Sequence, residues 1–78
     1  MKILFFAHLQ DVAGCVELQR DIGPVDVPGF WRELITEFPA LAEFRASVRL
    51  ARNGEYVDLE AQFSEADEVA LIPPVSGG

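Results

Sequence analysis

A single helical stripe in the middle of the chain constrains the fold more than any other feature of this sequence. Its members are large, apolar and spaced to share one face of a helix: Phe30, Trp31, Leu34, Ile35 and Phe38. Asp26 is expected to cap this helix, and Pro28 fits the first turn, where a missing N–H does no harm. Pro39 disfavours helical geometry in the residue before it, so the helix should end at Phe38. A helix with one apolar face must bury that face against another layer of structure.

The segment before the helix has the pattern of two β-strands. Residues 2–9 are apolar on both faces, with the run at 3–7 the most continuous part, and residues 16–22 nearly alternate between apolar and polar side chains. The connection between the two segments is short, which predicts an antiparallel hairpin.

A second hairpin and a last strand follow the helix. Residues 47–52 and 55–59 have strand patterns, and Asn53 and Gly54 between them accept the positive φ angles of a tight reversal. After a polar turn, residues 69–72 form another apolar strand. Pro73 and Pro74 end it because neither has a backbone N–H.

This order of hairpin, helix, hairpin and strand predicts an α+β fold in which a mixed sheet is covered on one face by one main helix. In the β-grasp arrangement of ubiquitin-like proteins, the first and last strands lie parallel in the middle of the sheet. That position would explain why residues 3–7 and 69–72 are the most continuous apolar runs. We therefore predict a β-grasp domain over residues 1–72 and an extended, flexible C-terminal tail over residues 73–78.

The composition argues against several classes of protein. The 78 residues include 13 Asp and Glu against 6 Lys and Arg, which gives a formal net charge of −7. Such a surface repels nucleic acids and anionic membranes and favours a basic partner. No segment has the length of a signal peptide or of a membrane span, so we expect a cytoplasmic location.

The sequence has no pattern for a catalytic or metal site made of side chains. His8 is the only histidine and lies among apolar neighbours in the first predicted strand, where a sheet histidine is the simpler interpretation. Cys15 is the only cysteine, which argues against an internal disulfide or a cysteine-based metal site. Asp67 and Glu68 are adjacent and would point to opposite faces of a strand. We expect no metal and no bound cofactor.

The end of the chain is the remaining candidate for function. It consists of Pro73, Pro74, Val75, Ser76, Gly77 and Gly78. The prolines favour an extended path of about 3.1 Å per residue, so the tail would project roughly 18 Å from the sheet. The glycines make its tip slim and free in φ, which suits a narrow channel in another protein.

The chemistry open to such a tail is limited. A carboxylate is a poor electrophile, so that of Gly78 would first need activation as an acyl-adenylate by a partner that uses ATP. Attack by a sulfur donor would then give a thiocarboxylate, which can deliver sulfur. Attack by a lysine would instead give an amide, as in protein tagging, and the residues alone leave both outcomes open.

Three segments together resemble the small, sulfur-carrier subunits of molybdopterin synthase. They are residues 2–7, the reversal at Asn53 and Gly54, and the closing residues 67–78, DEVALIPPVSGG. The resemblance runs the whole length of the chain, and the closing segment is its most specific part. It implies a ubiquitin-like sulfur carrier with a β-grasp fold.

The resemblance also implies partners and a reaction sequence. An activating enzyme related to those of ubiquitin would use ATP to adenylate Gly78, and a sulfur donor would then convert it to a thiocarboxylate. The tail would enter the large subunit of molybdopterin synthase and donate sulfur to cyclic pyranopterin monophosphate, in a heterotetramer of two small and two large subunits. The catalytic lysines belong to the large subunit, so this chain would be a non-catalytic, sulfur-donating co-substrate.

Partner contacts outside the tail are apolar in this family. By motif position they fall on Phe6, Tyr56 and Ile72. Phe6 and Ile72 fit a core role nearly as well, so Tyr56 is the most telling of the three.

Two places depart from the family pattern. Ala66 stands where glycine is common before Asp-Glu, and a left-handed conformation there would cost about 1 kcal/mol. Gln10 and Asp11 stand where Arg-Glu is common in the first hairpin loop. The first departure puts the geometry of that turn in question, and the second weakens any contact assigned to the loop.

Three other functions stay open at this point. The same tail chemistry would serve a sulfur carrier for thiamine or another thio-metabolite, and amide formation through Gly78 would serve a ubiquitin-like protein tag. An interaction domain with an inert tail is the least demanding alternative.

Overall fold

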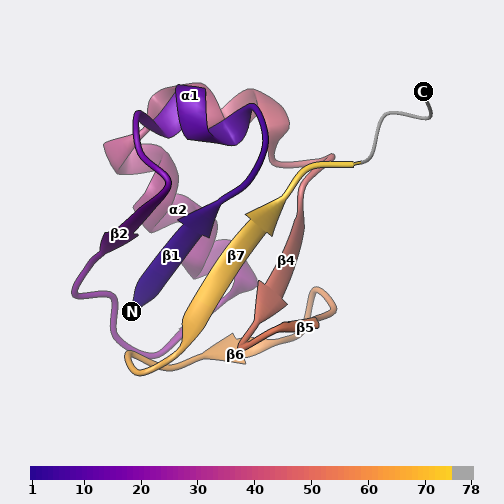
Figure 1. Ribbon diagram of the computed structural model, residues 1–78. Coiled ribbons are helices and arrows are strands. Elements are labelled where there is room, and N and C mark those ends of the chain that lie inside the picture. Colours follow the sequence, from indigo (N-terminus) through magenta and orange to yellow (C-terminus); the bar gives the residue numbers. More distant parts are fainter. Residues whose placement is uncertain (75–78) are drawn as a thin grey trace.

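The computed structural model describes residues 1–74, which form a five-stranded mixed sheet, a two-stranded sheet and helices (Figure 1). The five-stranded sheet has the strand order β2-β1-β7-β4-β5. Its strands are β1 (Lys2–Phe5), β2 (Glu17–Gln19), β4 (Arg49–Arg52), β5 (Glu55–Tyr56) and β7 (Glu68–Ile72). β1 and β7 are parallel at the centre, and the other three pairs are antiparallel. The predicted mixed sheet with a parallel central pair is confirmed.

Helix α2 (Val27–Glu37) forms at the predicted stripe and has both predicted ends. The Asp26 side chain accepts a hydrogen bond from the Gly29 backbone N–H at 2.8 Å, which caps the first turn. Phe38 leaves helical geometry with φ −126° and ψ 79°, and Pro39 begins the 3-10 helix η1 (Pro39–Phe44). The helix therefore ends just before Pro39, as predicted, because a proline disfavours helical geometry in the residue that precedes it.

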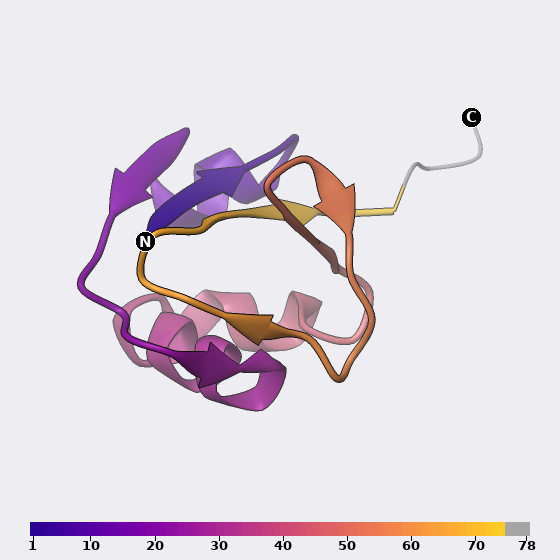
Figure 2. The ribbon, with the colours of Figure 1, turned by 90° about the horizontal axis from the view of Figure 1, so that it is seen from below.

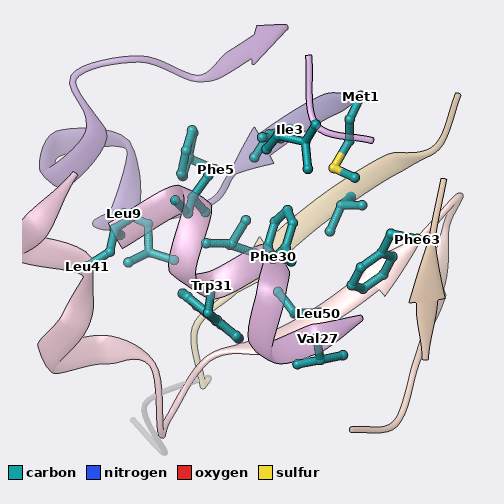
Figure 3. Close-up of a cluster of buried hydrophobic side chains, with 14 residues drawn as sticks. Met1, Ile3, Phe5, Leu9, Val27, Phe30, Trp31, Leu41, Leu50 and Phe63 are labelled. Carbon is teal, nitrogen blue, oxygen red and sulfur yellow. The ribbon is translucent and has the colours of Figure 1, made fainter. Parts of the chain in front are cut away.

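The stripe of α2 buries its large side chains against the inner face of the sheet. Phe30, Trp31 and Leu34 are buried, and Ile35 and Phe38 are half-buried. Figure 3 shows Phe30 and Trp31 among side chains from the strands, and Figure 2 shows α2 and η1 on one side of β1 and β7. The inward strand positions alternate and are all buried: Ile3, Phe5, Leu50, Val69 and Leu71.

One ion pair joins the end of the first hairpin to the end of α2. Arg20 follows β2 and donates from Nε to both carboxylate oxygens of Glu37, at 2.8 and 3.0 Å, and also from Nη2. These hydrogen bonds hold the pKa of the Glu37 carboxyl below its usual range. Both side chains are exposed, so the pair fixes geometry more than it adds stability.

The segment after β1 differs from the prediction. β1 ends at Phe5, Ala7 takes a left-handed φ of 53°, and residues Leu9–Ala13 form the short helix α1. The two strands do pair as predicted, but α1 makes the connection. His8 is therefore not a sheet residue: it is exposed before α1, with its ring centroid 5.1 Å from that of Phe44. A five-residue helix with one buried side chain is too short to leave a helical period in the sequence.

Several strands are shorter than predicted. The strands predicted over 16–22, 47–52 and 55–59 are shortened to β2, β4 and β5. The chain also pairs β3 (Val25–Asp26) with β6 (Gln62–Phe63), a two-stranded sheet that was not predicted. Two-residue strands carry no alternation, so only the tertiary fold brings them together. Within residues 1–74, no helix has the length and apolar character needed to cross a membrane.

The hydrogen bond that caps α2 can be tested by substitution. We expect Asp26→Ala to lower the free energy of unfolding by about 1 kcal/mol, because the Gly29 N–H loses its acceptor. Urea unfolding followed by circular dichroism measures this change. Asp26→Ser should keep most of the stability, and Asp21→Ala, an exposed aspartate outside the helix, is the matched control. Equal stability of Asp26→Ala and wild type would show that the cap is dispensable.

Candidate functional site

The face of the sheet opposite α2 carries a shallow apolar depression of about 240 Å³. The residues that line it come from β1, β7, β4 and the β4–β5 hairpin: Leu4, Phe6, Ala51, Gly54, Tyr56, Glu68, Ala70 and Ile72. We call this surface the outer face. It is made by the strand positions that alternate with those of the core.

The strand register explains the shape of the outer face. Ala70 of β7 lies beside Leu4 of β1 on one side and Ala51 of β4 on the other, and Ala51 lies beside Tyr56. The two alanines place small side chains at the centre, where they are only 9% and 6% exposed. Larger side chains stand around them, so the centre is hollow.

The three predicted contact residues all line this depression. Phe6 is 44% exposed and Tyr56 is 55% exposed, and exposed apolar side chains that gather in one patch mark an interaction site. Ile72 is half-buried beside them. A core role for Phe6 is thus excluded by its exposure, and the structure brings together three residues that are far apart in the sequence. Their contact with a partner stays a prediction.

An arginine fixes the aromatic ring at the edge of the outer face. The Arg49 guanidinium carbon lies 4.0 Å from the centroid of the Tyr56 ring, which is a cation–π contact. Arg49 is also the register partner of Ile72, so it stands at the end of β7 from which the tail leaves. At the other end, the Lys2 ammonium lies 3.6 Å from both the Glu17 and Glu68 carboxylates.

The turn that carries Tyr56 is held by a network that the sequence did not reveal. Asn53 and Gly54 have φ angles of 51° and 88°, as the predicted tight reversal requires. The Asn53 side chain also donates to Asp67 Oδ1 at 3.0 Å and accepts from the Glu68 backbone N–H at 2.9 Å. Asn53 therefore ties the hairpin to the start of β7 and positions Tyr56. An Asn-Gly pair signals only the turn, so this second role depends on tertiary contacts.

The Asp67 carboxylate is the other half of this network. It accepts from the Ser64 backbone N–H at 2.8 Å as well as from Asn53, and these two hydrogen bonds hold the pKa of Asp67 below its usual range. Ala66 in the same turn is not among the residues with positive φ. The left-handed conformation considered for Ala66 therefore does not occur, and its strain does not arise.

The tail begins at the same end of the sheet as Phe6 and Ile72. Beyond Ile72, where β7 ends (Figure 1), the described chain has no further strand pairing. Pro73 is buried, whereas Pro74 is exposed. Val75, Ser76, Gly77 and Gly78 lie outside the described residues, so the predicted extended tail and its domain boundary remain predictions. Gln10 and Asp11 lie on α1 and do not line the outer face.

The outer face has the apolar character of a surface that binds another protein. Within residues 1–74, no group of three or more His, Cys, Asp or Glu is placed to hold a metal ion. His8 and Cys15 do not line the outer face. What the described part of the chain offers is an apolar surface beside the start of the tail.

Comparison with known proteins decides the family. The model of the ThiS family matches residues 3–78. The chain belongs to the ThiS family. The molybdopterin synthase sulfur carrier subunit of Arabidopsis thaliana is 37% identical over 79 residues, which cover 100% of this chain and 82% of that protein. That of Homo sapiens is 32% identical over 85 residues, with 100% and 93% covered. The predicted resemblance is confirmed.

Solved structures agree with this ThiS-family assignment and with the β-grasp fold. SAMP1 from Haloferax volcanii, a small archaeal modifier protein, has a TM-score of 0.81 and 35% identity, with 100% of this chain and 98% of that chain covered. A complex of subunits 1 and 2 of molybdopterin-converting factor from Helicobacter pylori contains a chain with a TM-score of 0.63 and 23% identity. The match covers 99% of this chain and 96% of the Helicobacter pylori chain. At this identity the similarity shows a shared fold and nothing more.

The Asn53–Asp67 network of this ThiS-family chain predicts a pH dependence. Because the folded state holds the pKa of Asp67 below the ordinary value of about 4, the ionised carboxylate stabilises the fold above that pH. The contribution is lost as the pH falls through the lower folded-state value. Asp67→Asn should therefore be less stable than wild type at pH 7, and this difference should shrink below pH values of about 4.

Urea unfolding of both proteins at neutral and acid pH measures this effect. Glu65→Gln removes a charge from the same turn without removing a hydrogen bond within the described chain, so it should leave the stability at pH 7 unchanged. A stability difference between Asp67→Asn and wild type that stays constant with pH would refute the role assigned to the carboxylate.

Proposed function

We propose that this chain is the sulfur carrier subunit of a molybdopterin synthase and that the Gly78 carboxylate carries the sulfur. The observation that carries the proposal is similarity along the whole chain to proteins of that name, with the family match extending to residue 78. The outer face supports it, because an apolar surface beside the start of the tail can hold a partner while the tail reaches further.

The proposed chemistry begins with activation. A Gly78 carboxylate oxygen attacks the α-phosphorus of ATP on a separate adenylating enzyme, which releases pyrophosphate and leaves an acyl-adenylate. A donor that supplies sulfide (HS⁻) then attacks the carbonyl carbon and displaces AMP, giving the thiocarboxylate. ATP is thus consumed by the partner, and this chain binds no cofactor of its own.

Sulfur delivery follows on the large subunit. The thiocarboxylate sulfur attacks a carbon of cyclic pyranopterin monophosphate, and the bond from that carbon to oxygen breaks as the oxygen leaves with the opened phosphate or as water. Water then attacks the carbonyl carbon of the resulting thioester and cleaves its bond to sulfur. The sulfur stays on the pterin and the Gly78 carboxylate is restored. A dithiolene needs two sulfurs, which two loaded carriers on a dimer of large subunits would supply. We place this reaction in the cytoplasm.

The outer face is the proposed docking surface for the large subunit. Phe6, Tyr56 and Ile72 are partly exposed apolar side chains that already share one depression, so binding would require little rearrangement. Arg49 holds the Tyr56 ring before binding, which lowers the entropy lost on docking. Pro73 and Pro74 would direct the tail from this surface into the partner.

A protein tag is the second candidate, favoured by the likeness to SAMP1, which is named a modifier protein. Amide formation would use the same acyl-adenylate with a lysine in place of the sulfur donor. A carrier for thiamine or another thio-metabolite has less support, because the similar proteins of Arabidopsis thaliana and Homo sapiens carry the molybdopterin name.

Intact-mass analysis tests the sulfur-carrier proposal. After incubation with the adenylating enzyme, ATP and a sulfur donor, the chain should gain the mass difference between a sulfur and an oxygen atom. Deletion of Gly78 should abolish the gain. The shortened chain ends at Gly77, whose carboxylate lies one residue too close to the domain to reach the site of adenylation. No gain under conditions that thiolate a known carrier would refute the proposal, and chains found amide-linked to lysines instead would favour the protein tag.

A substitution on the outer face tests the docking surface separately. Tyr56→Ala should weaken binding to the large subunit by about 2 kcal/mol, roughly 30-fold in Kd, because it removes an exposed aromatic contact. Isothermal titration calorimetry measures the change. Val16→Ala is the matched control, since Val16 is 58% exposed but does not line the outer face. Equal binding of the Tyr56 variant and wild type would remove the outer face from the interface.

A further inference from the structure

A second and larger cavity, of about 760 Å³, lies on another side of β4. It is formed by the start of α2, the end of η1 with the residues after it, β4, and the loop that follows β5. Val27, Trp31 and Leu50, all buried, contribute to its lining and stand at one end of the core in Figure 3. It shares no lining residue with the outer face. We call it the side cavity.

The topology explains why the side cavity stays open. β5 has only two residues, after which the chain leaves the sheet, so within residues 1–74 no further strand covers this edge beside β4. Tyr56 and Val57 are consecutive, and they line the outer face and the side cavity respectively. Leu59 at the cavity is 83% exposed, the most exposed large apolar side chain in the described part of the chain. An apolar cavity with such a leucine beside it is typical of a binding site.

The charges around the side cavity are unusual for so acidic a chain. Arg45 and Arg49 both line it, and neither lies within ion-pair distance of a carboxylate in residues 1–74. Asp58 also lines the cavity, but its Oδ1 accepts from the Glu60 backbone N–H at 2.9 Å and so serves its own loop. The Arg45 guanidinium is thus available beside an apolar floor, whereas that of Arg49 also packs on the Tyr56 ring.

Guanidinium groups of this kind select carboxylates. Their planar N–H donors match the two oxygens of a carboxylate, and such charge-assisted hydrogen bonds are stronger than neutral ones. The formal net charge of −7 does not prevent this contact, because at physiological salt the Debye length is about 8 Å and nearby charges dominate. The charges of the side cavity therefore complement an acidic ligand even though the whole chain is acidic.

We propose that the side cavity docks a peptide segment of a partner protein in which a large apolar side chain is flanked by carboxylates. The apolar side chain would lie against Trp31 and Leu50, and a carboxylate would reach Arg45. The volume falls within the range of about 300–1,000 Å³ of cavities that enclose small ligands, so it suits a short segment. This inference goes beyond the proposed function, since the side cavity shares no lining residue with the outer face.

Trp31 makes the proposal directly testable, because it is the only tryptophan of the chain and lines the side cavity. The probe is a short synthetic peptide in which leucine and phenylalanine alternate with glutamate. It should change the Trp31 emission in a saturable manner and shift the amide NMR signals of residues 45–49 and 57–59. The same peptide with lysine in place of glutamate should bind at least about tenfold more weakly, since it cannot pair with arginine.

Variants separate the side cavity from general charge effects. Arg45→Glu should weaken binding of the glutamate peptide at least about tenfold, and Leu59→Ser should also weaken it. Arg32→Glu makes the same change of charge on an exposed position of α2 that lines neither surface, so it should leave the Kd within about twofold. Phe6→Ala, a change on the outer face away from the side cavity, should have no effect either, which distinguishes this test from the test of the outer face.

Three results would overturn the proposal. One is equal binding of the glutamate and lysine peptides, or no effect of either on Trp31. Another is an equal loss of affinity in the Arg45 and Arg32 variants. The third is self-association of wild type in sedimentation experiments that Arg45→Glu abolishes, because the occupant would then be a second copy of the chain. Thermal unfolding of each variant confirms that it is folded before binding is compared.

Discussion

The packing of the α2 stripe against the inner face of the sheet is the interaction on which the rest of the structure depends. Phe30, Trp31 and Leu34 meet the inward side chains of β1, β4 and β7, and each large apolar side chain that is fully buried contributes about 1.5–3 kcal/mol. A domain of this size has a single core, so loss of this contact would leave no other layer to hold the strands together. The Asp26 cap and Pro39 set the length of the helix and so decide which residues reach the sheet.

Because α2 covers one face, the opposite face is free to act on another protein. The same alternation that sends Ile3 and Phe5 into the core sends Leu4 and Phe6 outward, and the parallel register of β1 with β7 carries Phe6 toward Ile72. The core and the outer face are thus two consequences of one strand pattern. The outer face holds its shape through the Arg49–Tyr56 contact and the Asn53–Asp67 hydrogen bonds.

The division of surfaces fits the needs of a protein whose reactive group is proposed to act inside its partners. A carrier has to be recognised by an activating enzyme and then by the enzyme that uses the sulfur, while its own side chains take no part in the chemistry. The outer face lies beside the start of the tail, and the side cavity lies on another side of β4 with different charges. Two surfaces of different chemistry allow recognition without competition for the same residues.

The sequence by itself determined the elements with a strong period and the chemistry of the closing segment. The α2 stripe, its cap and stop, the Asn53–Gly54 reversal and the central apolar strands were all predicted, because local geometry and solvation fix them. The family resemblance came from short segments that can be read directly in the sequence, and it pointed to Phe6, Tyr56 and Ile72.

Only the tertiary structure decided which surfaces these residues form. The helix α1, the β3–β6 pair and the exposure of Phe6 depend on contacts between distant segments, which leave no periodic trace in a single chain. The second role of Asn53 and the placement of two arginines in the side cavity were hidden for the same reason, since a hydrogen-bond partner or a shared cavity is a property of positions in space. Local sequence sets the backbone preferences, whereas the packing of α2 on the sheet decides what remains exposed to a partner.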